Sequence, residues 1–108
     1  MITKKFLKRI YSNYEINYSK KIRNKTNYFA KRFAAKESLS KAIGIGFRKG
    51  LNFKDISILN DRYGKPYYEL NNKVKELICT KLKVKKIKIS LSLADEKKYS
   101  IAFSVIHK

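Results

Sequence analysis

Hydrophobic residues recur along the chain with two different periods, one before about residue 50 and another after it. In the first part they return every three or four positions, which is the spacing of one face of an α-helix. Ser12 followed by Glu15 forms a capping-box pattern, and Thr26 or Asn27 can cap the longest helix. This part of the sequence predicts three helices, at about residues 3–11, 13–21 and 28–43.

After residue 50, apolar and polar positions alternate, which is typical of strands with one buried face, except at 72–83, where the helical spacing returns. Turn-forming residues separate the first two alternating runs, and a longer pair near the C-terminus predicts an antiparallel hairpin. The expected elements are strands at 55–59 and 66–70, a helix at 72–83, and hairpin strands at 87–93 and 99–107. Helices followed by strands and one more helix predict the α+β class, and the chain length fits a single domain over 1–108.

The segment from Arg32 to Gly46 is unusual because its apolar residues lie all round the expected helix. That distribution predicts burial on most sides. Glu37 nevertheless stands in the middle of the segment, with Lys41 one turn later on the same face. A buried carboxylate must be paired or bind a cation. The two residues therefore form either an ordinary i,i+4 salt bridge or the start of a functional site.

Arg32 and Lys36 form a second same-face pair, turned more than about 100° from the first. Like charges at this spacing repel each other, so the pair favours a shared anion such as a phosphate. Gly44 is expected to end the helix in the left-handed conformation. A second glycine, Gly46, suggests backbone that approaches a ligand or changes direction sharply.

Charge is the strongest bulk feature, with 27 Lys and Arg against 8 Asp and Glu. Such a balance fits nucleic acid, an acidic protein or a phosphate-rich ligand, and AT-rich coding drift would also produce it. The chain is 44% hydrophobic and is therefore not expected to be disordered. It has no apolar run long enough to span a membrane, and its single cysteine, Cys79, excludes an internal disulfide, so we expect a cytoplasmic protein. No Cys/His metal set, catalytic triad or Walker loop is present in the sequence.

Residues 30–38, continued by 41–46, resemble the hallmark segment of holo-[acyl-carrier-protein] synthases, the 4'-phosphopantetheinyl transferases of fatty acid synthesis. The resemblance extends over about residues 28–106, in the family's order and spacing. Its further matching positions are 49–56, 60–61, 64–66, 89–96, Tyr99 and Ala102.

The resemblance implies a fold in which a long central helix packs on a small, mostly antiparallel sheet. It also implies Mg²⁺-dependent transfer of the phosphopantetheine arm from coenzyme A to a serine of acidic apo acyl carrier protein. Family members are trimers with active sites shared between neighbouring subunits. In this family Glu37 would bind Mg²⁺ and Lys41 would contact the coenzyme A phosphates. The nucleotide would be held by Arg32, Lys36, Gly44 and Gly46, and its adenine end would lie near Gly64, Lys65 and Pro66. A basic surface that includes Lys8 and Arg9 would steer the acidic carrier protein.

The family's N-terminal strand with a Gly-x-Asp motif, which carries a second metal carboxylate, has no match in this sequence. We therefore expect a start codon assigned too far downstream or a truncated gene, and an unpaired sheet edge in this form. Two alternatives to the transferase follow from the sequence. One is a degenerate homologue that binds acyl carrier protein without catalysis. The other is a basic nucleic-acid-binding module, which leaves the Arg32–Gly46 segment unexplained.

Overall fold

The structure is a computed structural model that describes residues 4–44, 52–95 and 100–107. Gly46, Tyr99 and residues 96–98, which lie between the two expected hairpin strands, are outside the described residues. Within the described ranges, no helix is both long and apolar enough to cross a membrane.

The N-terminal part folds into three helices, as the apolar spacing predicts. They are α1 (Lys4–Ile10), α2 (Asn13–Ser19) and α3 (Lys25–Ile43). The capping box of α2 is confirmed, because Ser12 Oγ accepts the backbone N–H of Glu15 at 3.3 Å and the Glu15 carboxylate accepts that of Ser12 at 2.9 Å. The expected start of α3 is wrong. Asn24 is its N-cap and accepts the Asn27 N–H at 3.0 Å, so the helix begins about one turn before Tyr28.

The C-terminal part confirms the predicted strands, helix and hairpin to within a few residues. Its elements are η1 (Phe53–Asp55), β1 (Ile56–Asn60), β2 (Pro66–Leu70), α4 (Asn72–Leu82), β3 (Lys88–Asp95) and β4 (Ser100–His107). Asn71 caps α4 by accepting the Val74 N–H at 2.9 Å. These elements make the fold α+β, as expected.

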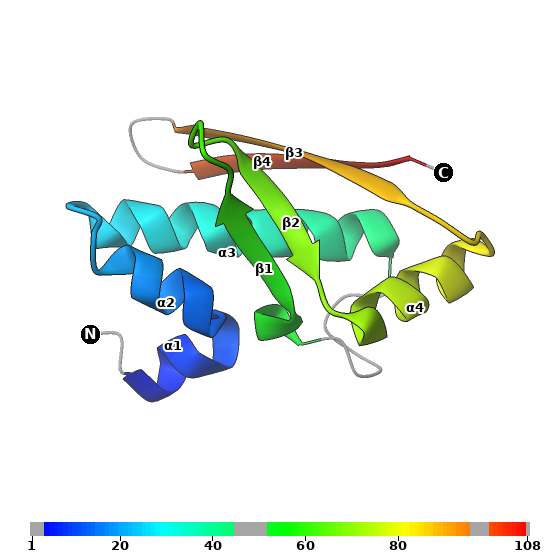
Figure 1. The fold of residues 1–108 in the computed structure, drawn as a ribbon, viewed down its shortest axis with the longest axis horizontal. Helices are drawn as coiled ribbons and strands as arrows, with labels where there is room; N and C mark the ends of the chain where they lie inside the picture. Colours follow the sequence, from blue (N-terminus) through cyan, green and yellow to red (C-terminus); the bar gives the residue numbers. More distant parts are fainter. Residues whose placement is uncertain (1–3, 45–51, 96–99, 108) are drawn as a thin grey trace.

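Helix α3 is the axis of the molecule, and both hairpins contact it (Figure 1). Strands β1 and β2 pair antiparallel, as do β3 and β4, and β2 lies beside β3. Among the described residues, ladder hydrogen bonds join only these two pairs, so the strands form two small sheets rather than one. Helix α2 packs near one end of α3 and α4 near the other (Figure 1).

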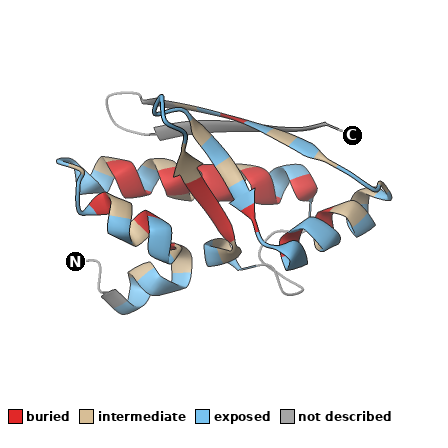
Figure 2. Ribbon diagram, in the orientation of Figure 1, coloured by how far each residue is buried: buried red, intermediate tan, exposed pale blue. Residues whose placement is uncertain are grey.

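Buried residues are concentrated on α3 and β1 (Figure 2). One hydrophobic cluster joins α3 to the strands and α4 through Ala35, Leu39, Ile43, Ile56, Ile58, Leu70, Val74, Ile78 and Leu91. A second, aromatic cluster joins α3 to the first two helices through Tyr11, Tyr28 and Phe29. The two clusters hold α3 between the N-terminal helices and the strands.

Candidate active site

Glu37 and Lys41 lie on an exposed face of α3, so the expectation that this helix is buried on most sides is wrong there. Both charged residues are described, and no ion pair joins them. The ordinary salt bridge is therefore not formed, and the Glu37 carboxylate is accessible to a ligand.

Arg32 belongs to the opposite, buried side of α3 and is only 5% exposed. Its Nη2 donates to Asn60 Oδ1 at 3.0 Å, and its guanidinium carbon lies 4.1 Å from the centre of the Tyr28 ring. Since each helical residue advances by about 100°, Arg32 and Glu37 project about 140° apart. The predicted separation between the pair Arg32 and Lys36 and the pair Glu37 and Lys41 is thus confirmed by burial.

A groove of about 490 Å³ lies beside Arg32, between α3, the β1–β2 turn and β3. It contains four of the residues that the family resemblance assigns to the nucleotide. These are Arg32, Gly64, Lys65 and Pro66. Tyr18 and Tyr28 also line the groove, with their rings stacked at a centroid distance of 5.8 Å. The groove therefore combines cationic groups with flat aromatic surface, which suits a phosphorylated nucleotide.

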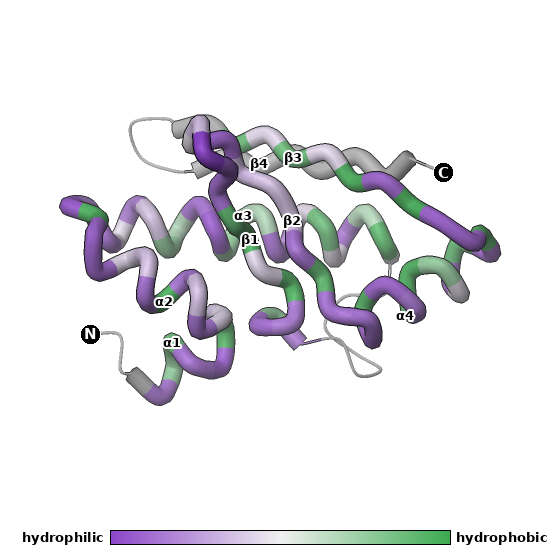
Figure 3. Tube along the Cα trace, viewed as in Figure 1, coloured by the Kyte–Doolittle hydropathy of each residue, from purple (hydrophilic) through white to green (hydrophobic). Residues whose placement is uncertain are grey.

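The β1–β2 turn that borders the groove is strongly hydrophilic and closely bonded (Figure 3). Asp61 Oδ1 accepts the backbone N–H groups of Tyr63 and Lys65, each at 2.9 Å. Gly64 has a φ of +83°, which only glycine adopts readily. Asn60 completes the turn by donating from Nδ2 to the Gly64 carbonyl at 3.2 Å. These contacts hold Lys65 at a fixed place on the groove rim.

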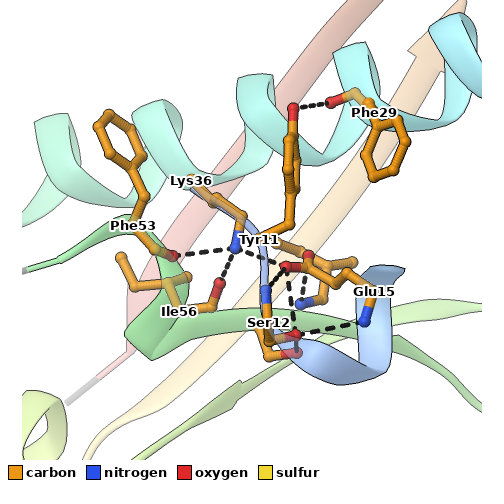
Figure 4. Close-up of polar contacts among 9 residues, drawn as sticks. Tyr11, Ser12, Glu15, Phe29, Lys36, Phe53 and Ile56 are labelled. Atoms are coloured by element: carbon orange, nitrogen blue, oxygen red, sulfur yellow. Dashed lines mark hydrogen bonds and ion pairs between the residues drawn. The ribbon is translucent and has the colours of Figure 1, made fainter. Parts of the chain in front are cut away.

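Lys36 does not reach the groove, although Arg32 one turn earlier does. It is fully buried, and its Nζ pairs with Glu15 Oε1 at 2.8 Å (Figure 4). The same Nζ donates to the Phe53 carbonyl at 2.9 Å and to the Ile56 carbonyl. Burial lowers the pKa of Lys36, and the Glu15 carboxylate opposes that effect. The anion that Lys36 contacts is therefore the Glu15 carboxylate and not a ligand phosphate. Lys36 is not part of the proposed nucleotide site.

Glu15 is a buried carboxylate that pairs with Lys36, and the sequence indicated only its part in the capping box of a helix. The rule that a buried carboxylate must be paired holds in this protein, but it applies to Glu15 and not to Glu37. The capping-box pattern was the only local signal, because its partner Lys36 lies 21 positions later. Nothing in the sequence spacing connects the two.

Gly44 ends α3 in the left-handed conformation, as predicted, with a φ of +85°. Its backbone N–H donates to the Ser40 carbonyl at 3.0 Å. Gly44 is exposed and lies about one turn beyond Lys41, on the side of α3 that carries Glu37.

Within the part of the chain that the structure describes, no three His, Cys, Asp or Glu side chains gather into a metal-binding group. Mg²⁺ in phosphate-transferring sites is often held by one or two carboxylates together with substrate phosphates and waters. The exposed Glu37 carboxylate, which forms no ion pair with another described residue, fits that pattern, with Lys41 on the same face. It does not fit a metal held by protein ligands alone.

The model of the 4'-phosphopantetheinyl transferase superfamily matches residues 2–104. The chain therefore belongs to this superfamily of transferases. Within it, the curated relatives are holo-[acyl-carrier-protein] synthases. The protein of that name from Pelagibacter ubique is 48% identical over 103 residues, which cover 95% of this chain and 80% of the relative.

Solved structures lead to the same family. Holo-[acyl-carrier-protein] synthase from Neisseria meningitidis has a TM-score of 0.86 and 33% identity, covering 99% of this chain and 83% of its own. The Helicobacter pylori enzyme, solved in complex with coenzyme A, has a TM-score of 0.79 and 31% identity, covering 95% of this chain and 82% of its own. These likenesses confirm the expected fold and the expected class of enzyme.

Proposed function

We propose that this protein transfers the 4'-phosphopantetheine arm of coenzyme A to a serine of apo acyl carrier protein, in a Mg²⁺-dependent reaction that supplies fatty acid synthesis. The observation that carries the proposal is the groove that gathers Arg32, Gly64, Lys65 and Pro66 in a member of this superfamily. A structural neighbour that was solved with coenzyme A supports the choice of donor.

The groove is the proposed site of the nucleotide end of coenzyme A. The Arg32 guanidinium is held by Asn60, and the hydrogen-bonded turn fixes the backbone from which the Lys65 side chain extends, so Arg32 is positioned before the ligand arrives. A fixed guanidinium binds phosphate oxygens strongly because little side-chain freedom is lost on binding. Gly64 and Pro66 add a surface without bulky side chains beside which the adenine end is proposed to lie.

The exposed face of α3 is the proposed site of the reaction. When bound, Mg²⁺ supplies neutralisation of charge on the pyrophosphate, and Glu37 is the residue proposed to hold it. Lys41, on the same face, is placed to neutralise further phosphate charge. In the transfer, the serine oxygen bonds to the phosphorus that bears the pantetheine arm. The pyrophosphate P–O bond breaks, the departing nucleotide keeps the electron pair, and the serine hydroxyl loses its proton to the surrounding water.

The nucleotide half and the reaction half of the site point about 140° apart on one helix. A single copy therefore does not present both to the same molecule of coenzyme A. We infer that each complete site takes Arg32 and Lys65 from one subunit and Glu37 and Lys41 from its neighbour. This arrangement is consistent with the proposed homotrimer, in which each of three equivalent contacts builds one site.

The exposed surface of α1, with Lys8 and Arg9 in its last turn, is the proposed docking place of the acidic carrier. Opposite charges accelerate encounter and select the partner, which suits a carrier that must be exchanged at every turnover. A formal net charge of +19 gives the whole protein the field that such steering needs.

The test is mass spectrometry of apo acyl carrier protein after incubation with this protein, coenzyme A and Mg²⁺. We expect the carrier to gain the mass of one phosphopantetheine, and we expect no gain with Glu37→Ala or with a chelator. Binding of the carrier without any gain in mass would favour the non-catalytic homologue. Steeply salt-dependent binding of DNA or RNA, without carrier binding, would favour the nucleic-acid module.

A further inference from the structure

Helix α3 needs a device that sets its rotation about its own axis. Buried apolar residues such as Ala35 and Leu39 give the helix an inward side, but hydrophobic contact is not directional and tolerates small rotations. A row of buried polar residues does single out one side. Arg32, Lys36 and Ser40 recur every four positions and are all buried. Hydrogen bonds and ion pairs depend on direction as well as distance, which hydrophobic contacts do not.

Lys36 is the member of this row that is bonded to other parts of the fold most extensively. Its Nζ contacts the α2 carboxylate of Glu15 and two carbonyls, at Phe53 in η1 and at Ile56 in β1 (Figure 4). Three separate elements therefore fix the end of this one side chain. Rotation of α3 about its axis would move the Lys36 Nζ and break at least one of these contacts.

The carboxylate of Glu15 is held equally firmly. Its Oε2 accepts the backbone N–H of Ile58 at 3.1 Å, and its Oε1 accepts that of Ser12 at 2.9 Å. The Ser12 hydroxyl in turn lies 2.7 Å from that of Ser57. The ion pair is thus the centre of a network that joins the start of α2, α3 and β1.

Stability alone does not account for such a network. A buried ion pair loses the hydration of both charges, and well-packed apolar side chains of similar size often replace it without loss of stability. The best supported use of a buried polar group is to select one arrangement among several that pack equally well. Here the arrangement selected is the rotation of α3 relative to α2 and β1.

Glu37 follows Lys36 directly, about 100° further round the helix. We propose that Glu15 and Lys36 are positioning residues of the transfer reaction. Their ion pair fixes the direction in which Glu37 projects towards the metal and the neighbouring subunit's nucleotide. The pair also connects α2, which contacts the proposed carrier-docking helix α1, to the helix that carries the reacting face. This inference rests on the proposed function, because it assigns the pair its role through Glu37.

The test compares Glu15→Gln with Ile78→Ala, a control that weakens the same hydrophobic core from α4. Glu15→Gln retains an acceptor for the Ile58 N–H but removes the charge opposite Lys36. Mn²⁺, used as a probe for the magnesium site, is titrated into each protein–coenzyme A complex and followed by electron paramagnetic resonance. In parallel, kcat and the KM for coenzyme A are measured at a temperature where both variants are fully folded.

For Glu15→Gln we expect about tenfold weaker Mn²⁺ binding and a similarly lower kcat, with the KM for coenzyme A within about twofold of wild type. Ile78→Ala should keep wild-type Mn²⁺ affinity and kcat. Equal behaviour of the two variants would overturn the inference. If Glu15→Gln does not fold, Ser57→Ala replaces it. It removes only the hydroxyl that contacts Ser12, and wild-type Mn²⁺ affinity in it would overturn the inference as well.

A different result is expected if the proposed function itself is wrong. In that case wild type itself neither transfers the arm nor binds Mn²⁺ in the presence of coenzyme A. If wild type does both and Glu15→Gln matches it, only the positioning role of the ion pair is contradicted.

Discussion

Arg32 and Glu37 are five positions apart on one helix and face opposite environments. Arg32 is 5% exposed beside the groove, whereas Glu37 stands on the exposed face about 140° away. A ligand that needs both residues is not offered them on one side of a single helix. This relationship is the structural basis for the proposal that the site is divided between subunits.

Lys65 is predicted to contribute to binding of the donor and little to the chemical step. Lys65 lines the groove, which lies on the other side of α3 from Glu37. Loss of one phosphate contact worth about 1.4 kcal/mol would raise the KM for coenzyme A about tenfold. Steady-state kinetics of Lys65→Ala should show this change with kcat almost unaltered. Lys73→Ala, at an exposed position on α4, is the control and should behave as wild type.

Charge reversal on α1 should affect the carrier rather than coenzyme A. The double variant Lys8→Glu/Arg9→Glu removes two exposed cations from the proposed docking surface and adds two anions. We expect the KM for acyl carrier protein to rise at least about tenfold at low salt, and the difference from wild type to shrink as salt screens the field. A KM for the carrier that is unchanged at low salt would place the docking surface elsewhere. The double variant Lys73→Glu/Lys81→Glu, at two exposed positions of α4, is the control matched for total charge.

Local chemistry explains why much of the fold could be predicted. The capping box of Ser12 and Glu15, the left-handed Gly44 and the turn at Asn60–Pro66 each depend on residues within a few positions. The start of α3 was misplaced because Asn24, Thr26 and Asn27 are all competent caps, and only the fold selects Asn24. Helical phase also predicted that Arg32 and Glu37 project in different directions.

Tertiary contacts explain what the sequence could not reveal about the site. A lysine is rarely buried, so nothing local indicated that Lys36 enters the core and pairs with Glu15 across 21 positions. The groove likewise depends on Asn60 and Lys65 arriving beside Arg32 from a distant hairpin. The family resemblance named most of these residues, but it did not separate the buried Lys36 from the groove residues.

Gly44 should be sensitive to a side chain because of its backbone conformation and not because of crowding. An added Cβ would meet no atom within 4 Å, but φ is +85°. Gly44→Ala is expected to lower the free energy of unfolding by about 1 kcal/mol, and Gly44→Asn by less, since asparagine tolerates this conformation better. Urea unfolding measures both variants. A Gly44→Ala protein as stable as wild type would show that the helix end relaxes.

Tyr28 should make the protein less stable at alkaline pH. Burial raises the pKa of its hydroxyl from 10.0 to about 12, against the opposing effect of the Arg32 guanidinium. The folded state therefore keeps a proton that the unfolded state loses first. Its stabilising contribution is complete below about pH 10 and is lost as pH rises through about 12.

Urea unfolding at about pH 9 and pH 11 tests this expectation. Wild type should lose about 1.4 kcal/mol more than Tyr28→Phe between these two values. Tyr63→Phe, at a residue that is 80% exposed, is the matched control and should keep the wild-type dependence. Equal losses in wild type and Tyr28→Phe would contradict the assignment.

The most direct test of the divided site is complementation between two inactive chains. Arg32→Met disables the nucleotide half and Glu37→Ala the reaction half, so each variant alone should fail to modify the carrier. When the two are co-expressed and assemble at random, about one quarter of the sites should combine an intact Arg32 from one subunit with an intact Glu37 from its neighbour. Mass spectrometry of the carrier should then show transfer at about that fraction of the wild-type rate. No transfer by the mixed assembly, with both variants folded and wild type active, would contradict a site shared between subunits.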